Sequence, residues 1–172
     1  SNSAEEMLKR DIVAAISNKL EATILGTEAG STTKPAGLLN GVTADSNAIT
    51  YEDIVEMEAT LEGANVSGEI KYIVSPTAKA ALKTTKIDAG SGKFAMEGNE
   101  VNGYPVLCTS AVADKGVIYG NFSDLVIAQW GGIDLTVDPY TQAAKGKVRL
   151  VINAYFDAKP RRAEAFVKKV LA

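Results

Sequence analysis

The residue types that most often perform catalysis are scarce in this chain. Histidine is absent, and Cys108 is the only cysteine. The missing imidazole excludes Ser-His-Asp and Cys-His nucleophile systems, histidine-ligated zinc and the commonest general base. Because no histidine can activate its thiol, we interpret Cys108 as a small buried core residue; it also has no partner for an internal disulfide. Any enzymatic chemistry would need carboxylate, lysine or tyrosine groups.

One segment is similar to a phosphate-binding loop. Gly90-Ser91-Gly92-Lys93 has the glycines and the lysine of that motif. The motif also requires a glycine five residues before its second glycine, where this chain has Ile87, and a Ser or Thr after the lysine, where it has Phe94. We therefore reject nucleotide binding at this segment.

Two charged segments are the remaining places for chemistry. The carboxylates from Glu52 to Glu62 lack the alternating spacing and the glycine of a calcium loop, which favours a solvated helix face. Residues 157–162 combine one acid, three cations and a proline. A surface turn is the favoured interpretation there, with a subunit-contact or ion-pair corner and a catalytic Asp-Lys pair as alternatives. The sequence thus predicts no catalytic residues, no metal site and no cofactor.

The composition is that of a folded globular chain. Apolar residues make up 46% and charged residues 23% of its 172 residues. No apolar run approaches the ~20 residues that span a bilayer. The polar start of the chain lacks a signal-peptide core, so we expect no contact with a membrane.

Charge is unevenly distributed along the chain, although the net charge is only −3. Residues 1–63 carry 4 basic and 11 acidic groups, and residues 145–172 carry 8 basic and 2 acidic groups. A solvated face is the first interpretation of the basic tail. The second is a surface that contacts the acidic front, residues 1–63, either within one subunit or between neighbouring subunits. Nucleic-acid binding ranks third, because the whole chain is acidic.

Apolar periodicity predicts a long first helix. Apolar residues recur at every fourth position from Leu8 to Ile24, behind a capping box that begins at Ser3, and Gly26 ends the helix. Residues 26–49 have no period and are rich in Gly, Ser, Thr and Asn, which predicts a long loop.

Two shorter helices are predicted after this loop. The first opens at a capping box formed by Thr50 and Asp53 and ends at Gly63. The second has Ser75 as its cap, a proline in its first position, and runs to about Thr84.

Apolar and β-branched runs between turn formers predict strands. Asn102-Gly103 is a hairpin-turn signal. Trp130-Gly131-Gly132 is interpreted as an apolar anchor where the chain leaves one sheet for another. Asn121-Phe122-Ser123 matches a glycosylation triplet, to which we assign no meaning without a secretory signal. The predicted strands are residues 70–74, 101–108, 117–119, 125–129, 133–137 and 148–156, with 163–171 as a short strand or helical turn.

Several short segments, in their order over nearly the whole chain, resemble the major capsid proteins of tailed bacteriophages, whose shell fold is shared with encapsulin compartments. No single segment is specific, and their order carries the resemblance. They are Gly37-Leu38-Leu39-Asn40, Tyr72-Ile73-Val74-Ser75-Pro76, Asn102-Gly103-Tyr104-Pro105-Val106, Tyr119-Gly120-Asn121-Phe122 with Trp130-Gly131-Gly132, residues 148–157, and Ala163-Glu164-Ala165-Phe166.

The resemblance implies an α+β fold with two lobes. A peripheral lobe, residues 1–34 and 131–172, would contain a long spine helix and long antiparallel strands. A small α/β axial lobe, residues 35–130, would cluster around the five- and six-fold axes of a shell. Relatives carry an N-terminal arm and an extended loop before the spine helix. We expect this chain to be the C-terminal portion, lacking both, and we carry the crosslinking chemistry of some relatives onto no residue here.

The implied function is that of a structural protein. We expect a major capsid protein that self-assembles into pentamers and hexamers of an icosahedral shell enclosing DNA without sequence-specific binding, assembled in the bacterial cytoplasm and located in the virion. Its partners would be other copies of itself, with a scaffold and a maturation protease as further partners. An encapsulin-like compartment shell is the alternative, and a histidine-free enzyme is a third hypothesis of a different class.

Overall fold

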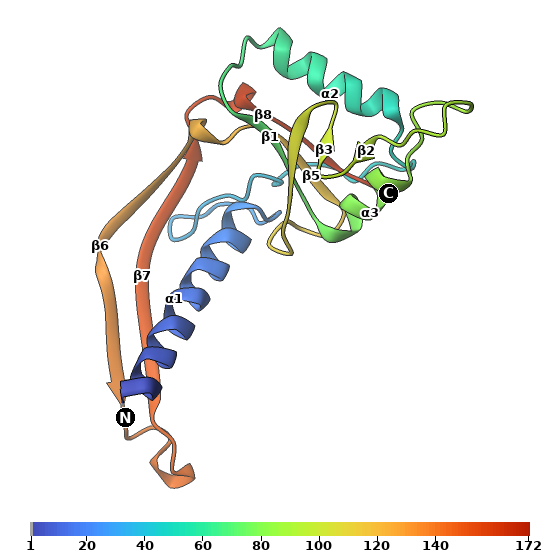
Figure 1. Cartoon of the computed structure of the whole chain (residues 1–172). Helices are drawn as coiled ribbons and strands as arrows, with labels where there is room; N and C mark the ends of the chain where they lie inside the picture. Colours follow the sequence, from blue (N-terminus) through green and yellow to red (C-terminus); the bar gives the residue numbers. More distant parts are fainter. Residues whose placement is uncertain (1) are drawn as a thin grey trace.

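The computed structural model describes residues 2–172, with side chains from residue 6 onward. It has a body that contains a sheet and two helices, and a long arm that projects from it (Figure 1). The arm consists of α1 (Asn2–Ile24) and the antiparallel strands β6 (Leu125–Asp138) and β7 (Arg149–Pro160). The body contains α2 (Tyr51–Gly63), α3 (Pro76–Thr84), β1 (Ile70–Val74), β2 (Met96–Glu97), β3 (Glu100–Val101), β4 (Tyr104–Cys108), β5 (Gly116–Asn121) and β8 (Phe166–Val170).

The body is built on one mixed sheet with the strand order β2-β3-β4-β1-β5-β8. β1 pairs with β4 in parallel, and the other neighbouring strands are antiparallel. α3 lies in the connection between β1 and β4, as a parallel pair requires a crossover. All six residues of β5 are buried, which places this strand at the centre of the body.

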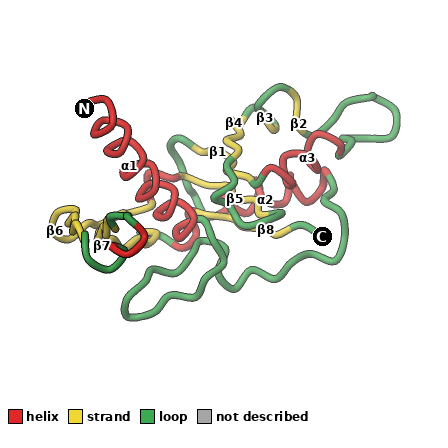
Figure 2. The backbone as a smooth tube through the Cα atoms, turned by 90° about the horizontal axis from the view of Figure 1, so that it is seen from below, coloured by secondary structure: helices red, strands yellow, loops and turns green. Residues whose placement is uncertain are grey.

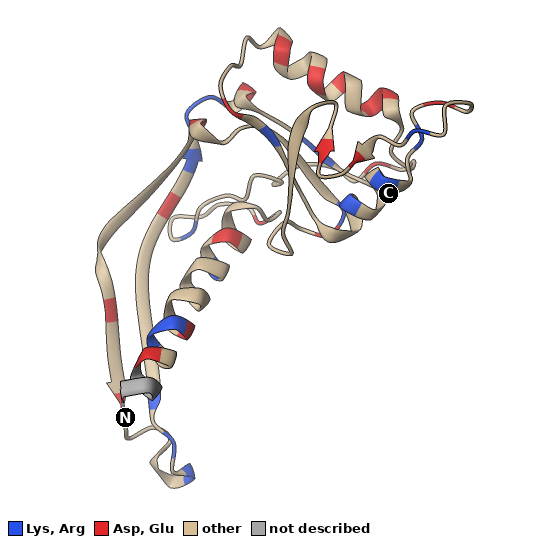
Figure 3. Ribbon diagram, viewed as in Figure 1, with Lys and Arg blue, Asp and Glu red and all other residues tan. Residues whose placement is uncertain are grey.

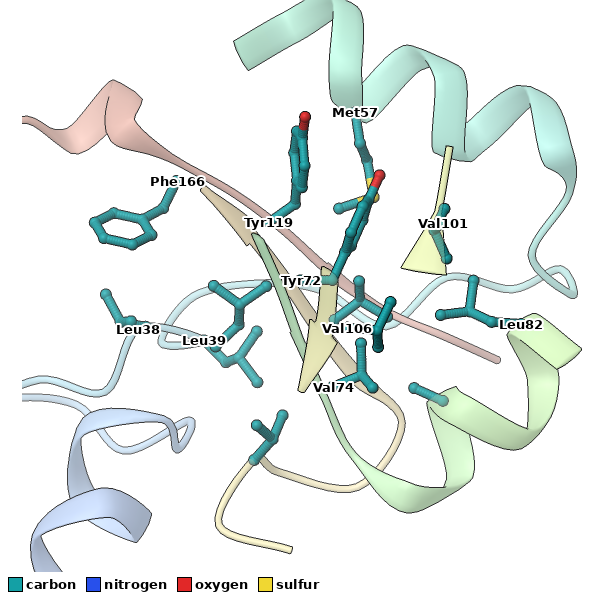
Figure 4. Close-up of a cluster of buried hydrophobic side chains, with 14 of the residues drawn as sticks. Leu38, Leu39, Met57, Tyr72, Val74, Leu82, Val101, Val106, Tyr119 and Phe166 are labelled. Carbon is teal, nitrogen blue, oxygen red and sulfur yellow. The ribbon is translucent and has the colours of Figure 1, made fainter. Parts of the chain in front are cut away.

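The core gathers around two tyrosines in the middle of this sheet (Figure 4). Tyr72 of β1 and Tyr119 of β5 are register partners and are both fully buried. α2 covers them with Ile54, Met57 and Leu61, the only buried side chains of that helix, spaced three and four residues apart on one face.

The long loop contributes to the core through a glycine-dependent contact. Leu38 and Leu39 are buried, and the backbone of Leu39 donates to the carbonyl of Gly26 at 3.0 Å. A Cβ atom on Gly37 would lie 2.1 Å from that same carbonyl oxygen. Only glycine permits this approach, which holds the loop against the end of α1.

Most of the predicted elements are confirmed. α2 opens at the predicted capping box: the Asp53 amide donates to Thr50 Oγ1 at 3.2 Å and the Thr50 amide donates to Asp53 Oδ2 at 2.7 Å. Ser75 caps α3 by accepting from the amide of Ala78 at 3.1 Å. α1 is the predicted long helix, but it begins at Asn2, so Ser3 lies inside it, and the Ser3 side chain lies outside the described residues.

The crossing between sheets predicted at Trp130-Gly131-Gly132 is wrong. β6 pairs with β7 on both sides of this segment, from Leu125 to Asp138, with only a bulge between Trp130 and Asp134. Gly131 has a φ of +69°, so glycine serves here to bend one strand and not to end it. The chain leaves the body at residues 122–124, a 3-10 turn that Asn121 caps by accepting from the amide of Ser123 at 3.1 Å.

The C-terminal strand and Cys108 also differ from the prediction. β8 joins the body by pairing with β5, whereas residues 163–172 were expected with the arm strands. Lys169 explains part of this placement, because its ammonium is held by acids of the body. Cys108 is exposed and not buried, since it ends β4 next to Leu107, which is also exposed.

Candidate interaction surfaces

The apolar stripe of α1 is covered only at one end. Ile24 is buried, Ile12, Ile16 and Leu20 are half-buried, and Leu8 is exposed. The helix lies beside β7, as Figure 1 and Figure 2 show from two directions. Between them runs a groove of about 520 Å³, lined mainly by Ala15, Ile16, Leu20, Ile152, Ala154 and Phe156. The stripe therefore continues beyond the surface that this chain itself can cover.

The two strands of the arm expose large apolar side chains along their whole length. Trp130 is 57% exposed and Tyr140, beyond the end of β6, is 86% exposed. A two-stranded ribbon is at best marginally stable in water, and extended apolar surface of this kind marks an interaction site. The other large apolar side chains exposed on the arm strands and their connection are Val126, Ile127, Ile133, Leu135, Val137, Val148 and Tyr155.

Acidic residues are frequent along α2 and basic residues at the tip of the arm, two separate parts of the molecule (Figure 3). The outer face of α2 carries acids, and the tip of the arm carries cations. We call these two groups the acidic face (Glu52, Glu56 and Glu62) and the basic tip (Lys145, Lys147 and Arg149). None of the six side chains forms an ion pair within the described part of the chain.

One cation of the basic tail meets the acidic front within the same molecule. Lys169 Nζ lies 3.0 Å from Asp45 Oδ2 and 2.5 Å from Asp53 Oδ1. The hydrogen bond from Lys169, together with that from Thr50, lowers the pKa of Asp53 to about 2. These two ion pairs join β8 to the long loop and to the first turn of α2, which confirms the predicted contact within one subunit for Lys169. Contact between neighbouring subunits stays a prediction.

A second polar cluster joins α2 to the turn between β3 and β4. Glu58 accepts from the hydroxyl of Tyr72 at 2.8 Å and from the side-chain nitrogen of Asn102 at 3.1 Å. Asn102 in turn accepts from the hydroxyl of Tyr51 at 3.0 Å. The Asn102-Gly103 turn is evident from the sequence, but these partners are not, because their pairing depends on how α2 packs.

The two loop segments that the sequence offers for chemistry, residues 90–93 and 157–162, make hydrogen bonds within the chain. In the loop that is similar to a phosphate-binding loop, Asp88 accepts from the amides of Gly90 and Ser91 at 2.7 and 2.6 Å, so the amides that would hold a phosphate bind a carboxylate of the chain. In the segment 157–162, Arg162 donates to the carbonyl of Ala64 at 2.9 Å, next to the end of α2. This contact is a hydrogen bond to the backbone and not an ion pair, and the cations of this segment form no ion pair within the described residues. The alternatives of a subunit-contact or ion-pair corner stay predictions.

The described residues contain neither a metal-binding cluster nor a membrane-spanning helix. From residue 6 onward, no three acidic, histidine or cysteine side chains converge in a way that would hold a metal ion. The helices in this range are also too short or too polar to cross a bilayer.

Sequence comparison identifies relatives over nearly the whole chain. The model of the Phage capsid family matches residues 1–170. A major capsid protein of Halomonas phage phiHAP-1 is 31% identical to this chain over an alignment of 172 positions. The alignment covers 96% of this chain and 28% of the relative. The chain therefore spans little more than a quarter of the curated relative that it matches.

Comparison of structures shows the same fold in two kinds of shell. The capsid of an empty GTA particle matches with a TM-score of 0.70 and 20% identity, over 96% of this chain and 65% of that protein. An encapsulin complex from Synechococcus elongatus matches with a TM-score of 0.58 and 13% identity, over 94% of this chain and 62% of that protein. At these identities the likeness concerns the fold alone.

Proposed function

The chain belongs to the phage capsid family, and on that premise we propose that it is shell-forming sequence of a major capsid protein, which assembles with copies of itself into the icosahedral head of a tailed phage or prophage. The observation that carries the proposal is the arm. It presents a two-stranded ribbon with apolar side chains on both strands and an α1 stripe that the chain leaves partly uncovered. Copies of a shell protein would cover these surfaces.

We propose that the arm and the body correspond to the two lobes expected of this fold. We place the peripheral lobe in the arm and the axial lobe in the body, with residues 122–124 and 161–165 as the connections between them. The separation of the acidic face from the basic tip also suits rings in which one subunit meets the next head to tail.

The partners that follow from the proposal are mostly other subunits. Pentamers and hexamers would be held by arm and body contacts, with a scaffold and a maturation protease acting during assembly in the bacterial cytoplasm. DNA would be enclosed in the virion without sequence-specific binding. No catalytic role is assigned to the chain.

An encapsulin-like compartment is the second candidate, favoured by the fold that this chain shares with the Synechococcus encapsulin. The two functions differ in content, since a phage head encloses DNA and a compartment encloses protein cargo.

The test is to express the chain within its complete coding sequence and to image the product by electron microscopy. Uniform closed shells are expected, and their content, DNA or protein, separates the two candidates. A product that remains monomeric at high concentration, with and without co-expressed neighbouring genes, would refute both.

A further inference from the structure

The Asn102-Gly103 turn is a sequence with its own reactivity. The backbone nitrogen of Gly103 can attack Cγ of Asn102, because glycine has no Cβ to obstruct the approach. A bond forms between these two atoms, ammonia leaves, and a five-membered succinimide results. Water then opens the ring to aspartate or isoaspartate. The reaction requires the carboxamide of Asn102 to turn toward the Gly103 nitrogen.

In this structure the carboxamide of Asn102 is held by α2 at both ends. Its nitrogen donates to the two oxygens of Glu58, each at 3.1 Å, and its oxygen accepts from the hydroxyl of Tyr51 at 3.0 Å. The turn is also fixed, with φ values of +49° for Asn102 and +83° for Gly103, as a two-residue hairpin turn requires.

We propose that Asn102 is a self-modification site that α2 keeps unreactive: Glu58 and Tyr51 hold its carboxamide away from Gly103, and separation of α2 from the turn starts deamidation. The product replaces a hydrogen-bond donor of Glu58 by a carboxylate at the same place. Two carboxylates at that distance repel each other, so the modified turn does not close again on α2. An isoaspartate also lengthens the backbone of a turn that has room for two residues. The site therefore converts a transient separation into a permanent one.

The chain contains its own reference for this proposal. Asn40-Gly41 is the same dipeptide, and both residues are exposed. In the described part of the chain the Asn40 side chain forms no hydrogen bond, whereas that of Asn102 forms three. The two sites share the intrinsic chemistry and differ in restraint.

The experiment is to incubate the folded protein at mildly alkaline pH and to follow both sites by peptide mass spectrometry with isoaspartate detection. Asn40 is expected to deamidate faster than Asn102 in the folded protein, and the two rates are expected to converge in urea. Tyr51→Phe and Glu58→Ala should each raise the rate at Asn102 by roughly three- to tenfold, the effect of losing one or more hydrogen bonds. The rate at Asn40 should not change in either variant. A rise at both sites would show that the variant unfolds globally, whereas a rise at Asn102 alone shows the loss of local restraint.

A second measurement tests the consequence. Asn102→Asp should lower the denaturant midpoint of unfolding. Combining it with Glu58→Gln should recover part of the lost midpoint, because the neutral amide at position 58 no longer repels the new carboxylate. Equal rates at Asn40 and Asn102 in the folded protein, or no change at Asn102 in both variants, would overturn the protective role of α2. An Asn102→Asp protein as stable as the wild type would overturn the repulsion.

Discussion

The rings of Tyr72 and Tyr119 stack in the core with centroids 4.3 Å apart, and only one of the two hydroxyls has a hydrogen-bond partner. Tyr72 donates to Glu58 at 2.8 Å, whereas the Tyr119 hydroxyl is buried without a partner. Burial raises the pKa of both tyrosines, and the bond to Glu58 raises that of Tyr72 further. The neighbouring Tyr104 also raises the pKa of Tyr119. Both tyrosines are therefore neutral at physiological pH, and the hydrogen bond to Glu58 is made by Tyr72.

This difference predicts opposite effects of the same substitution. Tyr72→Phe leaves Glu58 without a buried donor and should lower the free energy of unfolding by about 1–3 kcal/mol. Tyr119→Phe removes an unsatisfied hydroxyl and should leave stability unchanged or raise it. Denaturant unfolding of the two variants measures both values. A Tyr119→Phe protein that loses as much stability as Tyr72→Phe would show that the Tyr119 hydroxyl has a partner in solution.

The Lys169 ion pair predicts a pH dependence of stability. The pKa of Asp53 falls to about 2 in the folded protein, below its unfolded value, so its contribution is present above the unfolded pKa near 4 and is lost as pH falls toward 2. Burial alone would lower the pKa of Lys169, but Asp53 and Asp45 raise it overall, so its own contribution is lost only at strongly alkaline pH.

Lys169→Met should therefore destabilise the protein at pH 7 by about 1–2 kcal/mol and flatten its stability profile between about pH 4 and pH 2. Lys168→Met is the matched control, because the neighbouring lysine forms no ion pair within the described residues. Urea unfolding at several pH values measures the effect. Identical acid profiles for the two variants would contradict it.

The close approach of Gly37 to Gly26 predicts a large effect of one methyl group. Gly37→Ala would place its Cβ 2.1 Å from the Gly26 carbonyl oxygen, so the loop must move away from α1. We expect a loss of about 2 kcal/mol or more, measured by thermal unfolding. Gly63→Ala is the control, because nothing lies within 4 Å of its Cβ position, and its effect should be small.

The sequence predicted the local elements well, because each is determined by its own residues. The cap at Thr50, the cap at Ser75 and the long first helix depend on contacts three or four positions apart, and all three elements form as expected. The predictions that were wrong, the crossing at Gly131 and the placement of the C-terminal strand, depend on pairing with strands that are distant in sequence. Whether Gly131 bends a strand or ends it depends on β7, which lies about twenty residues further on.

The interaction surfaces were only partly predictable, for the same physical reason. Apolar runs predicted the strands, and the resemblance to capsid proteins implied that the long ones lie near the first helix, but neither shows which strand surfaces a partner covers. Asn121 was the clearest missed signal, since Asx capping of a short turn marks the true exit from the body. The pairing of Lys169 with Asp53 follows only from the placement of β8.

The acidic face and the basic tip predict salt-dependent association. If they meet between subunits, raising the ionic strength from about 0.1 M to about 1 M shortens the Debye length from about 10 Å to about 3 Å and should weaken assembly. Light scattering of the full-length protein across a sodium chloride series measures this. Apolar contacts respond little to sodium chloride, so assembly that is insensitive to salt would contradict electrostatic contact between neighbours.

The exposed apolar side chains of the arm predict an assembly defect without a folding defect. Trp130→Ser in the full-length protein removes a side chain that is already 57% exposed, so the free energy of unfolding of the isolated chain should change by less than about 0.5 kcal/mol. Assembly should fail or yield incomplete shells, because a buried tryptophan at an interface commonly contributes 2 kcal/mol or more.

The matched control is Val55→Ser, which alters an apolar side chain that is 44% exposed on α2 instead of the arm. Shell yield by sedimentation and electron microscopy, with unfolding curves of the same variants, separates assembly from folding. If Trp130→Ser assembles as well as the wild type while Val55→Ser does not, the principal contact surface lies on the body, and the role that we give to the arm is wrong.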